Sequence, residues 1–379
     1  MSTPLILDSL EIESFRAFKH LRIDRLGRVN LVTGRNNVGK SYLLEALWVY
    51  AHRGSAWEIL QLMQQRDEVQ LGGYFGLQGE EIDLDEQISN IRHIFYGRKD
   101  VQEHASPIKI GAIHKPHASL LIEVGSLSST GTGEPGQRQL QLFEPGMYGV
   151  ENQLLALVAQ IGMEEPEYYP LNRYFGRRLP QVRDKKKPIP STFIRANGLD
   201  PKEVGLLWDS IALTDLEPDV LGALRIIAPG IERVTFVAEP GSRSTRTPIV
   251  RTPQFDAPIP LRSMGEGMTR LLGIALSLVN ARNGILLIDE IESGLHYSVQ
   301  PDLWRLIFRV ANRLNIQVFA TTHSWDNIAA FQQAAQEDHE SEGMLISLRR
   351  NRDEPERVAA VLFDEKELAT INRENIEVR

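Results

Sequence analysis

The 379-residue chain contains no cysteine. It can therefore form no disulfide and bind no metal through thiolates, a composition typical of a cytoplasmic protein. It also has no apolar run of the ~18 residues that a membrane-spanning helix needs, so we expect no membrane partner. The first residues, MSTPLILDSLEIESF, lack a basic segment and alternate like a strand, which argues against a signal peptide.

Positive charge is in the minority as well, since the chain has 42 Lys and Arg but 50 Asp and Glu, for a net charge of −8. The surface as a whole does not favour nucleic acid. The stretch RYFGRRLPQVRDKKKPIP, residues 173–190, is a local exception, in which basic residues interleave with Tyr174 and Phe175. This composition suits a phosphate backbone with a stacking aromatic. A solvated loop and a docking site for an acidic protein fit it equally, so three interpretations stay open.

Glycine, by contrast, is placed with a clear pattern in GRNNVGKS, residues 34–41, after the β-branched run VNLVT. Two glycines enclose four residues and precede Lys-Ser, which is the spacing of a phosphate-binding P-loop. In such a loop, glycine lets backbone N–H groups converge on phosphate oxygens. Lys40 would reach the β- and γ-phosphates, and Ser41 would ligate Mg²⁺. The nucleotide-binding residues predicted here are Gly34, Arg35, Asn36, Asn37, Val38, Gly39, Lys40, Ser41 and Tyr42.

A second motif, GILLIDEIESGLH at residues 284–296, predicts the other half of a nucleotide site. Its apolar run indicates a buried strand, and such strands bring ligands to their carboxyl ends. Asp289 would hold Mg²⁺ opposite Ser41, and Glu290 would activate the attacking water. The following buried strand ends in TTHS, so His323 is predicted to sense the γ-phosphate from a neighbouring strand end.

A third motif, RSMGEGMTRLLG, opens a long apolar helix just before the Asp-Glu strand. Glycines at a helix start leave backbone N–H groups free for an anion. The residues predicted to form this second anion site are Ser263, Gly265, Glu266 and Gly267. A plain helix start without a ligand is the alternative.

The motifs occur in the order FRAF, VNLVTGRNNVGKS, RSMGEGMTR, LLIDEIESGLH and TTHS. This order resembles ABC-type ATPase heads of the SMC/RecF kind, especially the AAA-type ATPases that form the N-terminal half of OLD-family nucleases or occur as standalone chains. The resemblance covers about 1–60 and 220–340. It implies Walker A at 34–41, the signature at 263–267, Walker B at Asp289-Glu290, the D-loop at 292–296 and the switch histidine at 323. It further implies ATP and Mg²⁺ as cofactors and a homodimer or higher even oligomer that ATP closes head to head.

The sequence also departs from the family pattern. The signature has Arg262 where an apolar residue is usual and Met264 where glycine is usual, and the D-loop ends in GLH instead of ALD. The Q-loop glutamine could be Gln61, Gln64 or Gln65. Hydrolysis could therefore be slow or depend on a partner.

We expect an α/β fold, an ABC-type ATPase head with a mixed sheet and an inserted, largely helical segment. Residues 1–139 and 236–379 would form the head, and 140–235 the insertion. The nuclease (Toprim) domain of OLD enzymes needs a Glu and an Asp-x-Asp pair, and no Asp-x-Asp follows His323. The first hypothesis is therefore an ATP-driven switch for a separately encoded effector, a nuclease or toxin. The resemblance to standalone OLD-like ATPases implies defence against phage as its setting. The alternative is a RecF-like DNA-repair ATPase.

Overall fold

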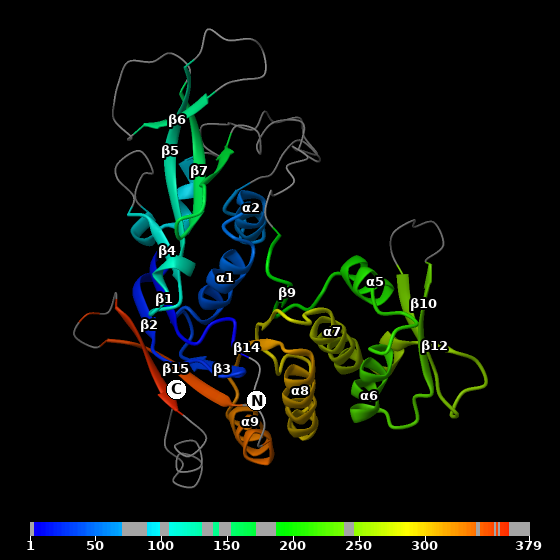
Figure 1. Ribbon diagram of the computed structural model, residues 1–379. Helices are drawn as coiled ribbons and strands as arrows, with labels where there is room; N and C mark the ends of the chain where they lie inside the picture. The colour runs from blue at the N-terminus through cyan, green and yellow to red at the C-terminus, as the bar shows by residue number, and fades with distance from the viewer. Residues whose placement is uncertain are drawn as a thin grey trace.

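Three β-sheets and the helices around them make up the protein, seen here in a computed structural model (Figure 1). The structure describes residues 4–69, 89–98, 106–130, 139–143, 153–171, 187–238, 246–338, 342–351, 354 and 357–363. The basic stretch at 173–190 lies outside these residues except for its last four positions.

The central sheet has the strand order β16-β15-β3-β14-β13-β9. Neighbouring strands from β9 to β15 are parallel, and only the edge strand β16 runs antiparallel. The mixed sheet that the sequence predicts is therefore present. Its strands are β3 (Val29–Gly34), β9 (Ser191–Ile194), β13 (Ile285–Ile288), β14 (Gln317–Thr321), β15 (Gly343–Arg350) and β16 (Val358–Phe363).

Both faces of this sheet are covered, as a parallel sheet requires. Val32, Leu287 and Phe319 belong to one hydrophobic cluster, with α1 (Lys40–Ala51), α2 (Ala56–Gln64) and the first sheet. Leu31 and Leu286 belong to the cluster on the other face. The helices on that face are α7 (Glu266–Asn280), α8 (Gln300–Leu314) and α9 (Trp325–Glu337).

The first sheet is antiparallel and has the order β2-β1-β4-β5-β7-β8, with β6 paired to β5. In Figure 1 its β5, β6 and β7 rise above α2, whereas β1 and β2 lie to the left of α1. Within this sheet, β4 and β5 form an antiparallel hairpin, joined through the segment HKPH. Its strands are β1 (Leu10–Phe15), β2 (Phe18–Ile23), β4 (Ile108–Gly111), β5 (Leu120–Thr130), β6 (Gln139–Phe143), β7 (Gln153–Ile161) and β8 (Glu167–Pro170).

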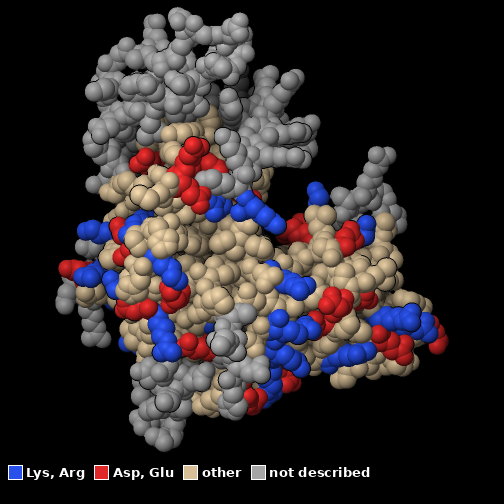
Figure 2. Space-filling view, viewed as in Figure 1, with Lys and Arg blue, Asp and Glu red and all other residues tan. Residues whose placement is uncertain are grey.

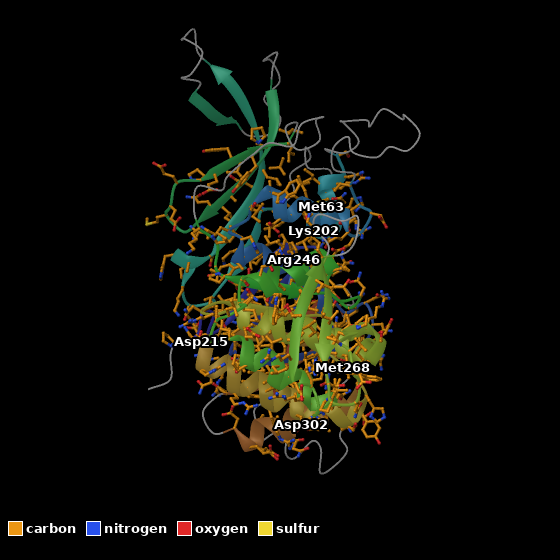
Figure 3. All side chains as sticks on the ribbon, turned by 90° about the vertical axis from the view of Figure 1, so that its right-hand side faces the viewer. Met63, Lys202, Asp215, Arg246, Met268 and Asp302 are labelled. Atoms are coloured by element: carbon orange, nitrogen blue, oxygen red, sulfur yellow. The ribbon has the colours of Figure 1, made fainter. Side chains whose placement is uncertain are left out.

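Two helices and a three-stranded sheet lie beside α7. They are α5 (Pro201–Asp209), α6 (Glu217–Ile227), β10 (Arg233–Ala238), β11 (Arg246–Arg251) and β12 (Ile259–Pro260). Asp200 and Glu203 form a capping box that fixes the start of α5. Figure 3 looks onto this unit, with Lys202 of α5 and Arg246 of β11 labelled. The remaining helical turns are 3₁₀: Ile91–Ile94, Tyr96–Arg98, Pro116–Ala118, Leu261–Met264 and Tyr297–Val299.

The expectation of a largely helical insertion at 140–235 needs correction. Within that range β7 and β8 belong to the first sheet, and β9 is the edge of the central sheet. Only α5 and α6 are helical among its described residues. The sequence of β7, QLLALVAQI, is rich in good helix formers. Nine paired positions with β5 decide its conformation instead.

The fold is thus mixed α/β, and the P-loop strand β3 and the Asp-Glu strand β13 flank β14 in the central sheet. Among the helices in the described part of the chain, none has the length and apolarity to cross a bilayer.

Candidate nucleotide site

The predicted P-loop follows β3 and leads directly into α1. Gly34, Asn37 and Gly39 all have positive φ angles, of 145°, 60° and 111°. Only glycine adopts such angles without strain as a rule, which explains its two fixed positions in the motif. A Cβ on Gly39 would also lie 2.8 Å from the ring of Phe18. The loop is therefore wound tightly around the start of α1.

The loop offers a strongly positive site. Lys40 is buried, and its Nζ donates to the carbonyls of Gly34 and Arg35 at 2.7 and 3.1 Å. Burial lowers the pKa of this ammonium, and the nearby carboxylates of Asp289 and Glu290 partly oppose that shift. No side chain caps the N-terminus of α1, so its first N–H groups remain available to an anion. A phosphate would meet both a desolvated cation and a helix end.

Ser41 and Asp289 are joined by a hydrogen bond, although they follow two different strands of the central sheet. Ser41 Oγ donates to Asp289 Oδ2 at 2.8 Å. The other oxygen, Oδ1, accepts from Thr321 Oγ1 at 2.6 Å. A hydroxyl and a carboxylate are oxygen ligands of the kind that Mg²⁺ prefers, so these two residues fit the predicted metal site. Thr321 was not singled out from the sequence, because nothing in its local pattern marks it.

Glu290 and His323 line one pocket together with Lys40 and Ser41. His323 Nε2 is 3.5 Å from Glu290 Oε1, and both side chains are about 40% exposed, at 38% and 40%. Glu290 Oε2 accepts a hydrogen bond from Ser293 Oγ at 3.2 Å. The structure therefore brings together the carboxylate and the histidine that the sequence predicts for hydrolysis.

The loop that carries His323 is held by a residue that the sequence analysis placed only in the D-loop. Glu292 Oε1 accepts from the backbone N–H groups of His323 and Ser324, at 2.7 and 3.2 Å. Its Oε2 accepts from Asn327 Nδ2 at 3.1 Å. Asn327 in turn accepts from the buried Trp304 ring at 2.6 Å. Glu292 thus fixes His323 to the helical core.

The pocket itself has a volume of about 930 Å³. Arg350 Nη2 donates to the carbonyl of Asn37 and so supports the P-loop from β15. Of the predicted nucleotide residues, Asn36, Asn37, Gly39, Lys40, Ser41 and Tyr42 line it, with Glu290 and His323. Residues that the sequence analysis did not assign complete the wall: Arg16, Ala17, Arg66, His93, Gly97, Arg98 and Arg350.

A buried charge network supports one wall of the pocket. Arg16 forms ion pairs with Glu45 and Glu68, and Arg66 also pairs with Glu45. The Tyr42 ring lies close to both guanidinium groups, 5.3 Å from that of Arg16 and 4.7 Å from that of Arg66. Burial raises the pKa of Glu45, against the pull of both arginines. Arg16 Nη2 is buried and has no hydrogen-bond partner among the described residues.

The three glutamines considered for the Q-loop are not on the pocket wall, but a neighbouring arginine is. None of Gln61, Gln64 and Gln65 lines the pocket, although all three lie at or near the end of α2. Arg66, the residue directly after them, does line it. The structure therefore offers a cation rather than an amide at this position.

The signature residues are exposed and do not line the pocket of their own chain. Ser263, Gly265 and Glu266 are exposed at the start of α7, and Gly267 is half-buried. Gly265 has φ 106°, and a Cβ there would meet no atom within 4 Å. The structure thus keeps the two predicted anion sites on separate parts of the surface.

Comparison with protein families supports an ATPase. A family model described as "AAA domain, putative AbiEii toxin, Type IV TA system" matches residues 152–330. A Helicobacter pylori protein named "ATP/GTP phosphatase" is 23% identical over 373 residues, which cover 91% of this chain and 93% of that protein. "Uncharacterized protein MJECL11" of Methanocaldococcus jannaschii is 38% identical over 88 residues, 23% of this chain and 76% of that protein. Over these residues the two chains belong to one family.

Among solved structures, this chain is similar to SMC heads. One is the SMC head bound to the C-terminal winged-helix domain of ScpA, with TM-score 0.48, 12% identity, and coverage of 95% of this chain and 98% of that one. Another is the SMC head domain from Thermotoga maritima, with TM-score 0.42, 15% identity, and coverage of 94% and 99%. The match to the AAA model over 152–330, together with the geometry of the P-loop and of the Asp-Glu strand, supports ATP hydrolysis by this chain.

Proposed function

We propose that this chain is a dimeric ATP-hydrolysing switch that controls a separately encoded effector, a nuclease or a toxin, in defence against phage. The observation that carries the proposal is the meeting of Ser41, Asp289, Glu290 and His323 at the carboxyl ends of three strands. The OLD-like resemblance of the motifs supports the control of a separate effector.

Each group in the site has a distinct task in hydrolysis. Lys40 and the N-terminus of α1 hold the β- and γ-phosphates. Ser41 and Asp289 would hold Mg²⁺, which supplies positive charge against the phosphates. Glu290 takes a proton from the attacking water, and His323 beside it contacts the γ-phosphate. Because Glu290 and His323 are both partly exposed, closure of the site would increase their effect by excluding water.

A second copy of the chain is the proposed closing element. The signature residues are exposed and lie off their own pocket, so they can cover the nucleotide only on another molecule. Gly294 of the D-loop also faces open space, and Tyr297 beside it is 62% exposed. We propose that these surfaces meet across a head-to-head dimer.

The alternative is a RecF-like ATPase that acts on DNA, and the basic stretch at 173–190 is the observation that favours it. On the face seen in Figure 2, described Lys and Arg side chains are interleaved with Asp and Glu. In this alternative, the basic stretch would supply the DNA site. Binding should then weaken steeply with salt, and neutralising Lys185, Lys186 and Lys187 should flatten that slope.

The deciding experiment is to purify the chain alone and together with the product of the neighbouring reading frame. Hydrolysis of ATP and GTP is measured for each preparation, with and without DNA. A stably bound partner whose activity changes with ATP supports the switch. DNA-stimulated hydrolysis by the chain alone supports the alternative, and absence of nucleotide binding under every condition contradicts both.

A further inference from the structure

Arg270, on α7, is a buried arginine whose guanidinium group donates hydrogen bonds to the backbones of two loops. It is 8% exposed. Its Nη2 donates to the carbonyls of Asp289 and Glu290 at 2.8 and 2.9 Å. Its Nη1 donates to the carbonyl of Arg195 at 2.6 Å, just after β9. A single side chain thus joins the signature helix to the backbone of the two predicted catalytic-site acids.

The backbone of Glu290, whose carbonyl accepts a hydrogen bond from Arg270, has an uncommon conformation. Glu290 has φ 48°, the left-handed region that non-glycine residues seldom adopt. Such a conformation persists only where its surroundings fix it. Glu290 N–H donates to Thr321 Oγ1 at 2.8 Å, and its carbonyl accepts from Ser293 N–H at 2.9 Å as well as from Arg270. The direction of the Glu290 side chain therefore depends partly on where α7 holds Arg270.

The signature loop is also packed directly against the D-loop. A Cβ on Gly267 would lie 3.0 Å from the carbonyl oxygen of Gly294 and 3.8 Å from Leu295. Gly267 and Arg270 are three residues apart, so they lie on the same side of α7. A displacement at the start of α7 must consequently move the segment from Asp289 to Leu295 with it.

We infer that Arg270 is a positioning residue that sets the Glu290 carboxylate according to the position of the signature helix. This inference rests on the proposed function. In a dimer, the signature loop of one copy would contact the nucleotide bound in the pocket of the other copy. That contact would then adjust Glu290 of the first copy, which acts on the nucleotide in the first copy's own pocket. Hydrolysis at the two sites of a dimer would be coupled through one guanidinium group in each chain.

The test uses the variant Arg270→Lys in the full-length chain. Lysine keeps the charge but cannot span carbonyls on two loops. Turnover at saturating ATP should fall about tenfold or more, within the range ascribed to general-base help. Affinity for a fluorescent ATP analogue should change less than threefold, because Lys40 and Ser41 are untouched. The matched control is Arg282→Lys, an exposed arginine just beyond the end of α7, which should behave like the parent.

A double-mutant cycle separates positioning from a merely structural role. If Arg270 acts through Glu290, then Arg270→Lys should reduce turnover no further once Glu290→Gln is present. The inference would be overturned if the losses of turnover from Arg270→Lys and Glu290→Gln multiply in the double variant. It would also be overturned if Arg270→Lys leaves turnover unchanged, or if this variant loses ATP affinity in parallel with turnover. A parent chain that hydrolyses no nucleotide contradicts the proposed function instead, so the two failures are distinguishable.

If Arg270→Lys does not fold, hydrogen exchange in chains that keep Arg270 tests the inference instead. Exchange is compared between the parent and Ser263→Arg, an exposed substitution outside the pocket, with a non-hydrolysable ATP analogue. Peptides over 286–295 should lose nucleotide-dependent protection in the variant together with those over 264–272. Protection that changes at 264–272 alone would overturn the inference.

Discussion

Ser41 Oγ donates a 2.8 Å hydrogen bond to Asp289 Oδ2 across 248 positions of sequence. The two residues follow strands β3 and β13, which are separated in the sheet by β14. Thr321, at the end of β14, binds the other oxygen of the same carboxylate. The three central strands therefore converge on one aspartate, and the predictions below address the groups around it.

Lys40→Ala should weaken ATP binding by about ten- to a hundredfold. A hydrogen bond to a charged group contributes ~1.5–3 kcal/mol, and the variant loses the one ammonium that lies within the P-loop. Equilibrium binding of a fluorescent ATP analogue measures the loss. Lys202→Ala, on the exposed surface of α5, serves as control. Parent-like affinity in Lys40→Ala would refute the P-loop assignment.

Glu290→Gln should stall hydrolysis and hold ATP in place. The amide keeps the size of the side chain but cannot accept the proton from water, so turnover should fall about 10²–10⁴-fold. Mass measurement with ATP and Mg²⁺ should then show two chains associated, or solution scattering should show compaction of an existing dimer. Turnover at the parent rate would remove Glu290 from its role. Stalling without association or closure would contradict closure by the partner's signature loop.

Thr321→Val should impair hydrolysis although the residue touches no predicted nucleotide atom. Valine has nearly the same shape but loses both the bond to Asp289 and the acceptor for Glu290 N–H. Partners of metal-binding carboxylates typically contribute about 10–100-fold in metal affinity or activity. The Mg²⁺ concentration for half-maximal turnover should therefore rise. Thr321→Ser retains the hydroxyl and should restore it; equal defects in the two variants would argue against the hydrogen bonds.

Glu45→Ala should lower the thermal stability of the chain severely. Arg16 would keep its burial but lose one of its two carboxylate partners. Removing one member of a buried ion pair typically costs about 3–5 kcal/mol, a large part of the stability of most domains. Asp209→Ala breaks an exposed pair with Arg246 instead and should change the melting temperature little. Similar melting temperatures for the two variants would show that the network does not stabilise the fold.

Local sequence patterns were sufficient to predict much of the site. The P-loop could be read from eight consecutive residues, because glycine spacing and the helix start are both local properties. The Asp-Glu strand and the strand before His323 were likewise predicted from short apolar runs with polar ends, and both are present as β13 and β14. The roles of these residues in catalysis stay predictions.

Only the tertiary structure decided how these segments are arranged. It placed β14 between β3 and β13, and it paired β7 with β5 although the sequence of β7 favours a helix. It also brought Arg16 of FRAF, Arg270 of RSMGEGMTR and Thr321 of TTHS to the site, three residues to which the sequence analysis gave no role. The physical reason is that such contacts join residues far apart in the chain, where packing and hydrogen bonding outweigh local propensity. The sequence alone therefore predicted which chemical groups a nucleotide site would use, and the fold determined which other side chains hold those groups in place.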